Sequence, residues 1–271
     1  MRVGSLTIEL RGETHVSVVY FAGDLAFKIL KPLRLAFLDH STLETRGAAL
    51  RAEYELNRRI SPDVYLGVAA LEADDGILEH VLVMRRMPES RRLTSLAGTD
   101  EFDDQLRAVA KRVAAFHASL DPDEEAAVIA SIPSERRRWH DNLDELVDLI
   151  EVIAPTGLDT GRIARLRERA DRYLDHRGKL FEQRVHEGFC RDGHGDLLAD
   201  DIFCLDDGPR ILDCLAFSTR LRKGDVLADI AFLVMDIERI AGETAALSLL
   251  LWYQEFSAEQ HPGSLAQFYV A

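Results

Sequence analysis

The hydrophobic period of the chain changes once along its length, and this change constrains the fold more than any other feature. Over the first 88 residues apolar and polar side chains alternate, as in "HVSVVYFAG" (15–23) and "DLAFKILKP" (24–32), which predicts strands. From about residue 100 onward, apolar residues recur every three or four positions, which predicts helices. We therefore predict two lobes, a small β-rich lobe over 1–88 and a larger, mostly helical lobe over 89–271.

The first lobe is predicted to be an antiparallel meander that is interrupted by one helix. A turn signal at Gly23-Asp24 separates two of its strands, Ser41 or Thr42 can cap the helix, and Pro88 begins a link to the second lobe. The expected strands and helix, in order, are 5–10, 15–23, 24–32, the helix 41–60, 65–73 and 76–87.

The second lobe is predicted to contain five long helices with a short hairpin between them. The expected helices are 101–120, 136–153, 161–188, 225–240 and 244–260, and the expected strands are 201–206 and 210–217. The chain has no internal repeat and no low-complexity tract. This order of elements places it in the α+β class.

Charge is distributed unevenly between the two predicted lobes. Of a net charge of −14, residues 1–88 carry −1 (11 Lys/Arg against 12 Asp/Glu), which leaves −13 for the remainder. Phosphate backbones bind basic surfaces, so this balance argues against a nucleic-acid partner. A solvated acidic surface accounts for the charge better than attraction of a cationic substrate does.

Apolar segments and cysteines indicate the compartment. No apolar run approaches the length of a membrane span, and "MRVGSLTIELRGETH" lacks the uninterrupted apolar core of a signal peptide, so we expect a cytoplasmic protein without a membrane partner. Cys190, Cys204 and Cys214 show neither CxxC nor histidine spacing, which disfavours disulfides and a zinc site. They are expected to be reduced core residues.

Carboxylates gather in "RDGHGDLLADDIF" (191–203) and at the end of the following strand. Phosphoryl transfer from ATP requires oxygen ligands for Mg²⁺, a base near the acceptor hydroxyl and a lysine for the phosphates. Asp196 is the candidate base, and Asp201 and Asp213 are the candidate metal ligands. Any single aspartate can be a solvated loop residue instead, but Asp213 lies between the apolar runs "RIL" and "CLAF", where an unpaired carboxylate would be costly without a cation or hydrogen bonds.

These motifs resemble one family. The sequence His-Gly-Asp-Leu, an oxygen ligand five residues after the aspartate, an aspartate closing the next strand, and then "GD" and "LADIAFL" resemble the aminoglycoside phosphotransferases of the protein-kinase-like fold. The segments "ETHVSVVYFAGDLAFKILKP", "LNRRISPDVYLG" and "RDGHGDL" are most similar to a bacterial branch whose members are often fused to a P-loop ATPase domain. The resemblance covers nearly the whole chain and is least distinctive between residues 120 and 180.

The resemblance implies a bilobal fold that holds ATP between the lobes. By motif position Lys28 would reach the α- and β-phosphates, although a lysine there can also be the polar half of an alternating strand. Glu53 would be its ion-pair partner, since helical spacing places it on the inner face and leaves Glu55 to pair with Arg51 or Arg59 on the surface. His194 would brace the catalytic loop. The hinge that reads adenine would lie near residues 83–87, with Val83, Met84 and Met87 as candidates.

Three positions depart from the family pattern, and one region carries no motif. Leu198 stands where histidine is common, Asp201 replaces the commoner asparagine, and Ala216 stands where this branch tends to carry an acid. Relatives usually continue into another helix beyond "AQFYVA", so a truncated form is expected. Residues 120–180, which build the acceptor pocket in this fold, contain no motif that identifies the acceptor.

The leading hypothesis is a phosphotransferase that uses ATP and Mg²⁺ to phosphorylate the hydroxyl of a small molecule. The three departures support an alternative, a nucleotide-binding pseudokinase or regulatory domain with little turnover. A third possibility, a metal-dependent phosphohydrolase, leaves Lys28 and the β-rich lobe unexplained.

Overall fold

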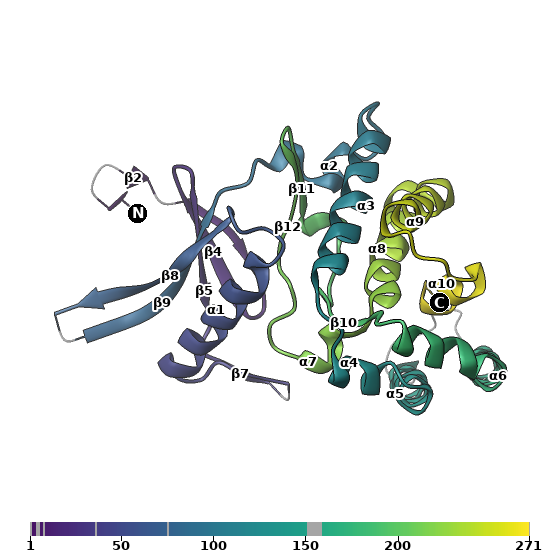
Figure 1. Ribbon diagram of the computed structural model, residues 1–271. Coiled ribbons are helices and arrows are strands. Elements are labelled where there is room, and N and C mark those ends of the chain that lie inside the picture. Colours follow the sequence, from purple (N-terminus) through teal and green to yellow (C-terminus); the bar gives the residue numbers. More distant parts are fainter. Residues whose placement is uncertain are drawn as a thin grey trace.

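The computed structural model describes residues 2–3, 6–7, 9–35, 37–74, 76–150 and 159–270. It has an antiparallel five-stranded sheet with one helix at the N-terminal side and a largely helical region at the C-terminal side (Figure 1). The α+β architecture predicted from the change of hydrophobic period is therefore confirmed.

The first part of the chain contains nine strands and one long helix among the described residues. They are β1 (Arg2–Val3), β2 (Leu6–Thr7), β3 (Glu9–Glu13), β4 (Ser17–Ala22), β5 (Leu25–Leu30), β6 (Arg34–Leu35), β7 (Leu38–Asp39), α1 (Leu43–Arg58), β8 (Tyr65–Ala73) and β9 (Gly76–Arg85).

The main sheet has the strand order β3-β4-β5-β9-β8, and all of its neighbours are antiparallel. The predicted meander is confirmed, but its first strand is placed wrongly: the edge strand is 9–13 rather than 5–10, and Leu6–Thr7 pairs with Arg2–Val3 instead. Residues 5 and 8 of the predicted strand lie outside the described residues. The polar run Arg11-Gly12-Glu13 enters the sheet because β4 supplies its backbone partners, with an irregularity between Leu10 and Gly12.

Helix α1 covers one face of this sheet (Figure 1). Thr42 caps it: its side chain accepts a hydrogen bond from the N–H of Thr45, and the Thr45 side chain accepts one from the N–H of Thr42. Leu50 packs with Leu82 of β9 in the core between helix and sheet. The helix is thereby fixed against the last strand before the link to the helical region.

The second part of the chain is mainly helical. Its elements are η1 (Glu89–Arg91), α2 (Leu93–Leu96), α3 (Phe102–Ser119), α4 (Glu124–Ile129), α5 (Ile132–Ile150), α6 (Thr160–His186), β10 (Cys190–Asp192), η2 (Ala199–Asp201), β11 (Ile202–Leu205), β12 (Gly208–Ile211), α7 (Thr219–Arg222), β13 (Lys223–Asp225), α8 (Val226–Ala241), α9 (Glu243–Ser257) and α10 (Gly263–Val270).

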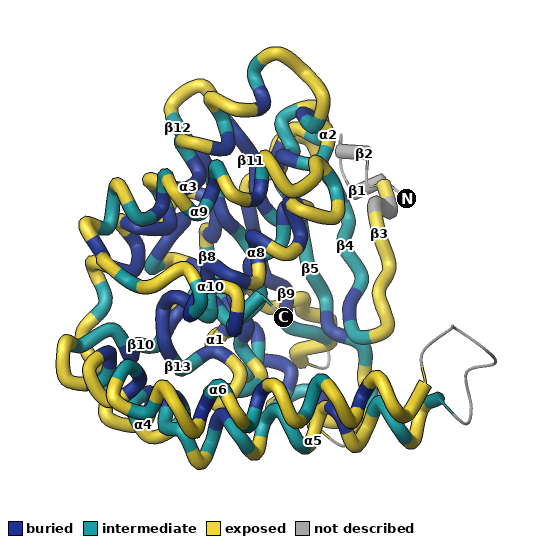
Figure 2. Tube along the Cα trace, turned by 90° about the vertical axis from the view of Figure 1, so that its right-hand side faces the viewer, coloured by how far each residue is buried: buried dark blue, intermediate teal, exposed yellow. Residues whose placement is uncertain are grey.

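The core of this part lies between α3, α8 and α9, whose buried faces meet in Figure 2. Leu106, Val113, Leu233, Leu249 and Tyr253 are almost fully buried there. All three cysteines are buried free thiols, as predicted. The five predicted long helices are confirmed, although α5 begins four residues earlier than expected and residues 151–153 of its predicted end lie outside the described residues.

The predicted strand 210–217 is wrong beyond Ile211. The backbone of Asp213 has a φ of 63°, in the left-handed region, which breaks the ladder after β12. The short elements β6, β7, α2, α4, α7, β10 and β13 were also not predicted, because two to six residues are too few to show a hydrophobic period. Within the described ranges, every helix is too short or too polar to cross a lipid bilayer.

Candidate active site

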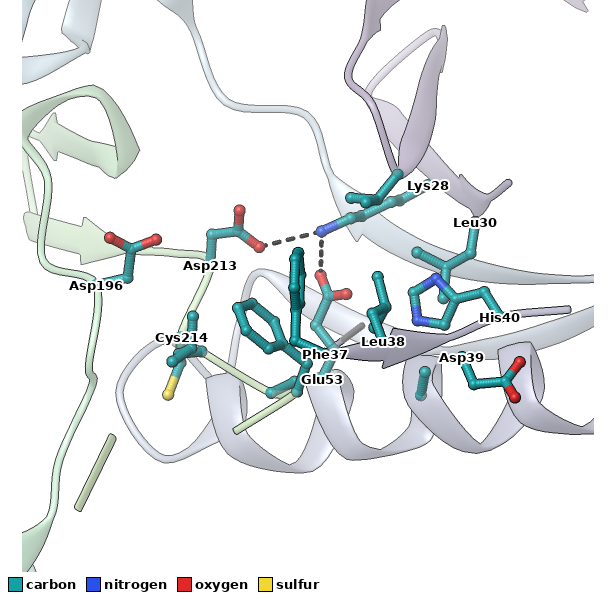
Figure 3. A pocket seen from close by; sticks show the side chains of 15 residues that line it. Lys28, Leu30, Phe37, Leu38, Asp39, His40, Glu53, Asp196, Asp213 and Cys214 are labelled. Atoms are coloured by element: carbon teal, nitrogen blue, oxygen red, sulfur yellow. Dashed lines mark hydrogen bonds and ion pairs between the residues drawn. The ribbon is translucent and has the colours of Figure 1, made fainter. Parts of the chain in front are cut away.

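Lys28, Glu53 and Asp213 meet between the two lobes (Figure 3). The Lys28 Nζ atom donates to Oε1 of Glu53 at 2.8 Å and to Oδ1 of Asp213 at 3.0 Å. Burial alone would disfavour the charged ammonium, but Asp213 and Glu53 outweigh it and raise the pKa of Lys28. The lysine is therefore a permanent cation at this position.

The sequence places Lys28 and Glu53 on facing surfaces. Lys28 pairs with Val19 and Leu82 in the sheet, so its side chain points to the face that α1 covers. Glu53 lies on the inner face of α1 and is 7% exposed, whereas Glu55 is exposed. The inward position predicted for Glu53 from helical spacing is what the structure has.

Side chains of the first lobe hold the backbone at Asp213. Its N–H donates to Oη of Tyr65 at 3.0 Å, and the N–H of Cys214 donates to Oδ1 of Asn57 at 2.9 Å. The Asp213 side chain is 54% exposed, and Lys28 supplies the cation that its apolar neighbours in sequence led us to expect. It projects into the cleft, where Lys28 lowers the pKa of its carboxyl group.

The loop that carries His194 and Asp196 is fixed by Asp229 of α8. Its carboxylate accepts the N–H of His194 at 2.7 Å and the N–H of Gly195 at 2.8 Å. His117 donates to the same carboxylate at 3.0 Å and accepts from Tyr253. Gly195 has a φ of +82°, and a Cβ there would lie 2.7 Å from Cα of Arg222, so only glycine fits.

His194 is fully buried and braces the loop. Burial lowers the pKa of its imidazole, so the ring is neutral at pH 7. Its Nε2–H donates to the carbonyl of Leu212 at 3.1 Å, which leaves Nδ1 to accept the N–H of Asp196 at 3.4 Å. This one ring therefore ties the 194–196 loop to the segment that precedes Asp213.

Asp196 lies half-buried at the cleft, and no described residue donates a hydrogen bond to its carboxylate. Burial, together with the negative charges of Asp213 and Asp229, raises the pKa of its carboxyl group. A carboxylate in this state is suited to accept a proton.

Asp201 follows the loop in η2. Burial, with Asp213 and Asp196 nearby, raises the pKa of its carboxyl group to about 7. Its neighbour Ala199 donates its N–H to Asp236 of α8 at 2.9 Å, which fixes the turn. The three predicted carboxylates are thus close enough to repel one another, and a cation would relieve that repulsion.

The donor set of Asp201 and Asp213 suits Mg²⁺, which is bound by one or two carboxylates together with substrate phosphates and water. Across the described residues, no group of three or more His, Cys, Asp or Glu side chains forms a complete metal cage. Two carboxylates at an open cleft fit a metal that arrives with a nucleotide better than a resident metal.

Two cavities open from this centre, and both are lined by Lys28, Glu53 and Asp213. The first, here called the sheet cavity, has a volume of about 520 Å³ and lies against the five-stranded sheet. Its other lining residues are Gly12, Thr14, Ser17, Val19, Phe21, Ala26, Tyr65, Met84, Arg85, Met87, Glu89, Arg92, Asp201, Phe203 and Leu212.

The second, here called the helix cavity, has a volume of about 290 Å³ and lies beside α1 and the β6–β7 hairpin (Figure 3). Its other lining residues are Val16, Leu30, Phe37, Leu38, Asp39, His40, Ala49, Asp196, Cys214, Leu215, Ala216 and Phe217. The candidate base therefore belongs to the helix cavity, and the candidate metal ligand Asp201 belongs to the sheet cavity.

Two of the three predicted hinge residues line the sheet cavity. Met84 and Met87 line it, whereas Val83 does not, because adjacent residues of β9 point to opposite faces. The backbone N–H groups of Arg85 and Arg86 are used by Val64 and Asp24. Among the described residues, the N–H of Met87 has no hydrogen-bond acceptor.

Sequence reasoning missed two residues that shape the site. Asp229 was quoted within a motif but was given no role. Its position inside the apolar run "VLADIAFLV" was a signal that its carboxylate accepts hydrogen bonds from buried donors. Arg59 was one of two expected surface partners of Glu55, with Arg51 as the other; instead it donates to the carbonyls of Asp192 and Gly193 at 2.8 Å each. It links the end of α1 to the segment that leads into the 194–196 loop.

Comparison with known proteins gives the fold. No family model matches the chain. It is similar to an aminoglycoside phosphotransferase from Streptomyces rimosus solved with ADP and streptomycin, with a TM-score of 0.54, 16% identity, and coverage of 93% of this chain and 88% of the other. It is also similar to choline kinase from Cryptosporidium parvum, with a TM-score of 0.56, 11% identity, and coverage of 100% and 81%. The kinase-like fold predicted from the motifs is confirmed.

Two curated relatives are more similar in sequence. Uncharacterised proteins of Mycobacterium tuberculosis and Mycobacterium bovis are each 38% identical over 261 residues, which is 96% of this chain. The chain spans about half the length of these relatives, 52% of each.

Proposed function

We propose that the protein is a phosphotransferase that moves the γ-phosphate of ATP to the hydroxyl group of a small molecule and requires Mg²⁺. The observation that carries the proposal is the position of Lys28, which is paired with Glu53 and reaches Asp213 across the cleft, with Asp196 and Asp201 on either side. Two solved proteins of the same fold are named as an aminoglycoside phosphotransferase, which was solved with ADP, and as a choline kinase. Their names indicate transfer of phosphate to small molecules, which agrees with this arrangement.

The sheet cavity is the proposed nucleotide site. Apolar side chains from both lobes, Val19 and Ala26 above and Phe203 and Leu212 below, are suited to the faces of adenine. The N–H of Met87, for which the described residues offer no acceptor, would donate to the adenine edge. Lys28 would contact the α- and β-phosphates, which stabilises the charge that develops on the leaving group.

We assign one proton transfer to the chain's own residues, and Asp196 performs it. Asp196 accepts the proton of the acceptor hydroxyl as the new O–P bond forms and the bond between the γ-phosphorus and the β,γ-bridging oxygen breaks, which releases ADP. General-base assistance of this kind contributes about 10²- to 10⁴-fold. Asp201 and Asp213 would hold Mg²⁺, which when bound supplies positive charge to the phosphates. His194, Arg59 and Asp229 hold the loop and take no proton from substrate.

The experiment that tests the proposal is the substitution Asp196→Asn. We expect phosphate transfer to fall by at least about 10²-fold while the thermal shift caused by ATP with Mg²⁺ is unchanged. Asp206→Asn is the matched control, because the Asp206 side chain is fully exposed outside the cleft. Full turnover by the Asp196 variant would refute the base assignment.

One observation favours a second candidate, a nucleotide-binding domain without turnover. Ala216 lines the helix cavity at the position where the resemblance leads one to expect an acid. Stabilisation by ATP with Mg²⁺, without ATP consumption over a panel of hydroxylated acceptors, would support this candidate.

The remaining parts of the proposal concern the whole protein. We propose that 1–88 forms the nucleotide-binding lobe and 89–271 the catalytic and substrate lobe, and that the protein works in the cytoplasm. The greater length of the mycobacterial relatives agrees with a further fused domain, for which a P-loop ATPase is the proposed identity.

A further inference from the structure

Basic side chains follow one face of helix α6. Residues 160–179 contain seven Lys/Arg and three Asp/Glu, although the whole chain has a net charge of −14. Five exposed basic side chains recur every three or four positions and therefore share one face of the helix: Arg162, Arg165, Arg169, Arg172 and His176. We call these five residues the basic stripe. In Figure 1, α6 lies on the side of the helical region away from the five-stranded sheet.

Two of the acidic residues of α6 face another helix. Arg136 of α5 binds the carboxylates of both Asp171 and Asp175, and His140 of α5 contacts Asp171 at 3.0 Å. Residues 171 and 175 are about one helical turn apart, so they share the face that meets α5. Their charge is used by α5 and does not neutralise the basic stripe.

The basic stripe has few anionic partners of its own. Glu168 accepts a hydrogen bond from Arg172 at 2.7 Å, but the two side chains are 69% and 63% exposed, so this pair is weak. Among the described residues, no carboxylate forms an ion pair with Arg165 or Arg169. Like charges three or four positions apart destabilise a helix, so a bound anion would relieve a repulsion that the chain leaves in place.

A cavity of about 330 Å³ lies at the C-terminal half of the basic stripe. It is lined by Arg169, Arg172, Tyr173, His176 and Arg177. Three of these five residues are arginines, and no acidic side chain of the described residues lines the cavity. Cavities of this volume are able to hold a small molecule, and a cationic lining favours one with negative charge.

Contacts within the lobe give this cavity a fixed shape. The ring of Tyr173 stacks on that of Phe268 of α10, with centroids 4.9 Å apart. Nδ1–H of His176 donates to the carbonyl of Arg172 at 2.7 Å, which leaves Nε2 without a hydrogen-bond partner among the described residues. The backbone of Arg177 has a φ of −119° and a ψ of 15°, so the helix bends at this end of the cavity.

We propose that this cavity binds the phosphate group of a small soluble molecule, held by Arg169, Arg172 and Arg177. The planar guanidinium group presents paired N–H donors that match the oxygens of a phosphate. A membrane surface fits less well, because none of the large apolar side chains that are exposed among the described residues belongs to α6. The site is separate from the cleft and does not depend on the proposed function.

Titration of the whole chain with inorganic phosphate tests the proposal, by calorimetry at constant ionic strength. We expect saturable binding that Arg169→Gln weakens about five- to tenfold, and that Arg169→Lys weakens about two- to threefold, because the charge stays and the fork is lost. Arg51→Gln, an exposed substitution on α1, is the matched control and should change nothing. Absence of saturable binding at millimolar phosphate, or equal weakening by the control, would overturn the proposal.

Two further arms identify where the phosphate binds and what carries it. Excess ADP with Mg²⁺ should leave phosphate binding unchanged; if ADP abolishes it, the phosphate occupies the cleft and the proposal fails. The second arm measures cosedimentation with vesicles of phosphatidylcholine and phosphatidic acid. Cosedimentation that depends on Arg169, without binding of inorganic phosphate, would assign the arginines to a lipid surface and overturn a small soluble ligand.

Discussion

The Nζ atom of Lys28 lies 3.0 Å from Oδ1 of Asp213, although 185 residues separate them in the chain. This contact joins the sheet of the first lobe to the segment after β12 in the second. Glu53 shares the same ammonium at 2.8 Å. Because the side chains of Lys28 and Glu53 are 15% and 9% exposed, the pair is effectively buried, and removal of one partner is expected to be costly.

A double-mutant cycle on this pair gives the first prediction. Lys28→Met leaves Glu53 buried without its cation and should lower the free energy of unfolding by roughly 3 kcal/mol. Lys28→Met combined with Glu53→Met should recover most of that loss, because apolar residues replace both charges. Chemical denaturation measures both of these and the single variant Glu53→Met, which completes the cycle. Strictly additive losses would contradict the predicted coupling.

The second prediction concerns Asp229, which accepts the N–H groups of His194 and Gly195. Asp229→Asn should lower kcat by about 10²-fold. The amide NH₂ group that replaces one carboxylate oxygen donates hydrogen bonds and cannot accept a backbone N–H, so the loop that carries Asp196 should shift. The thermal shift with ATP should persist, since the sheet cavity is not lined by Asp229. Unchanged kcat would show that the loop holds its geometry without this carboxylate.

The third prediction concerns Tyr65, whose Oη accepts the N–H of Asp213. Tyr65→Phe leaves that N–H without its partner and should lower the free energy of unfolding by about 1–2 kcal/mol. It should also weaken ATP binding that depends on Mg²⁺, because Asp213 loses its anchor. Calorimetric titration with and without Mg²⁺ measures this; equal weakening in both conditions would contradict a role through Asp213.

The fourth prediction is a pH dependence away from the cleft. Glu135 of α5 is 3% exposed, and burial raises the pKa of its carboxyl group to about 7, against the opposing effect of Arg138. The folded state therefore binds this proton more tightly than the unfolded state does. Stability should decline as pH rises from about 4.5 to about 7, by up to roughly 3 kcal/mol from this group.

Glu135→Gln should remove that decline. The variant should be more stable than the natural chain at pH 8, and the difference should vanish near pH 4.5, as measured by urea denaturation at several pH values. Glu145→Gln, an exposed substitution on the same helix, is the control. A difference that is constant over this pH range would show that Glu135 does not titrate as proposed.

Much of the fold could be predicted because each long element carries its own hydrophobic period. The inner face of α1 places Leu50 and Glu53 correctly. Motif position singled out Lys28, whereas its place on the covered face of β5 is seen only from its strand partners. The motif spacing also predicted that Asp196, Asp201 and Asp213 lie at one cleft, and all three line its cavities.

The contacts that hold the site could not be predicted in the same way, because they depend on tertiary partners. The left-handed backbone of Asp213 ends β12 earlier than the apolar run "CLAF" suggests. Arg59 has the spacing of a surface ion pair, yet it binds two carbonyls that are more than 130 residues away in the chain. A pattern within one helix carries no information on such a partner.

The central claim is that Asp201 and Asp213 hold a divalent cation against a triphosphate beside Lys28. Anomalous diffraction from a crystal grown with Mn²⁺ and a non-hydrolysable ATP analogue tests it most directly. We expect a Mn²⁺ peak coordinated by carboxylate oxygens of Asp201 and Asp213, with the phosphates in contact with Lys28. A peak bound to other residues, or a nucleotide outside the sheet cavity, would contradict the account.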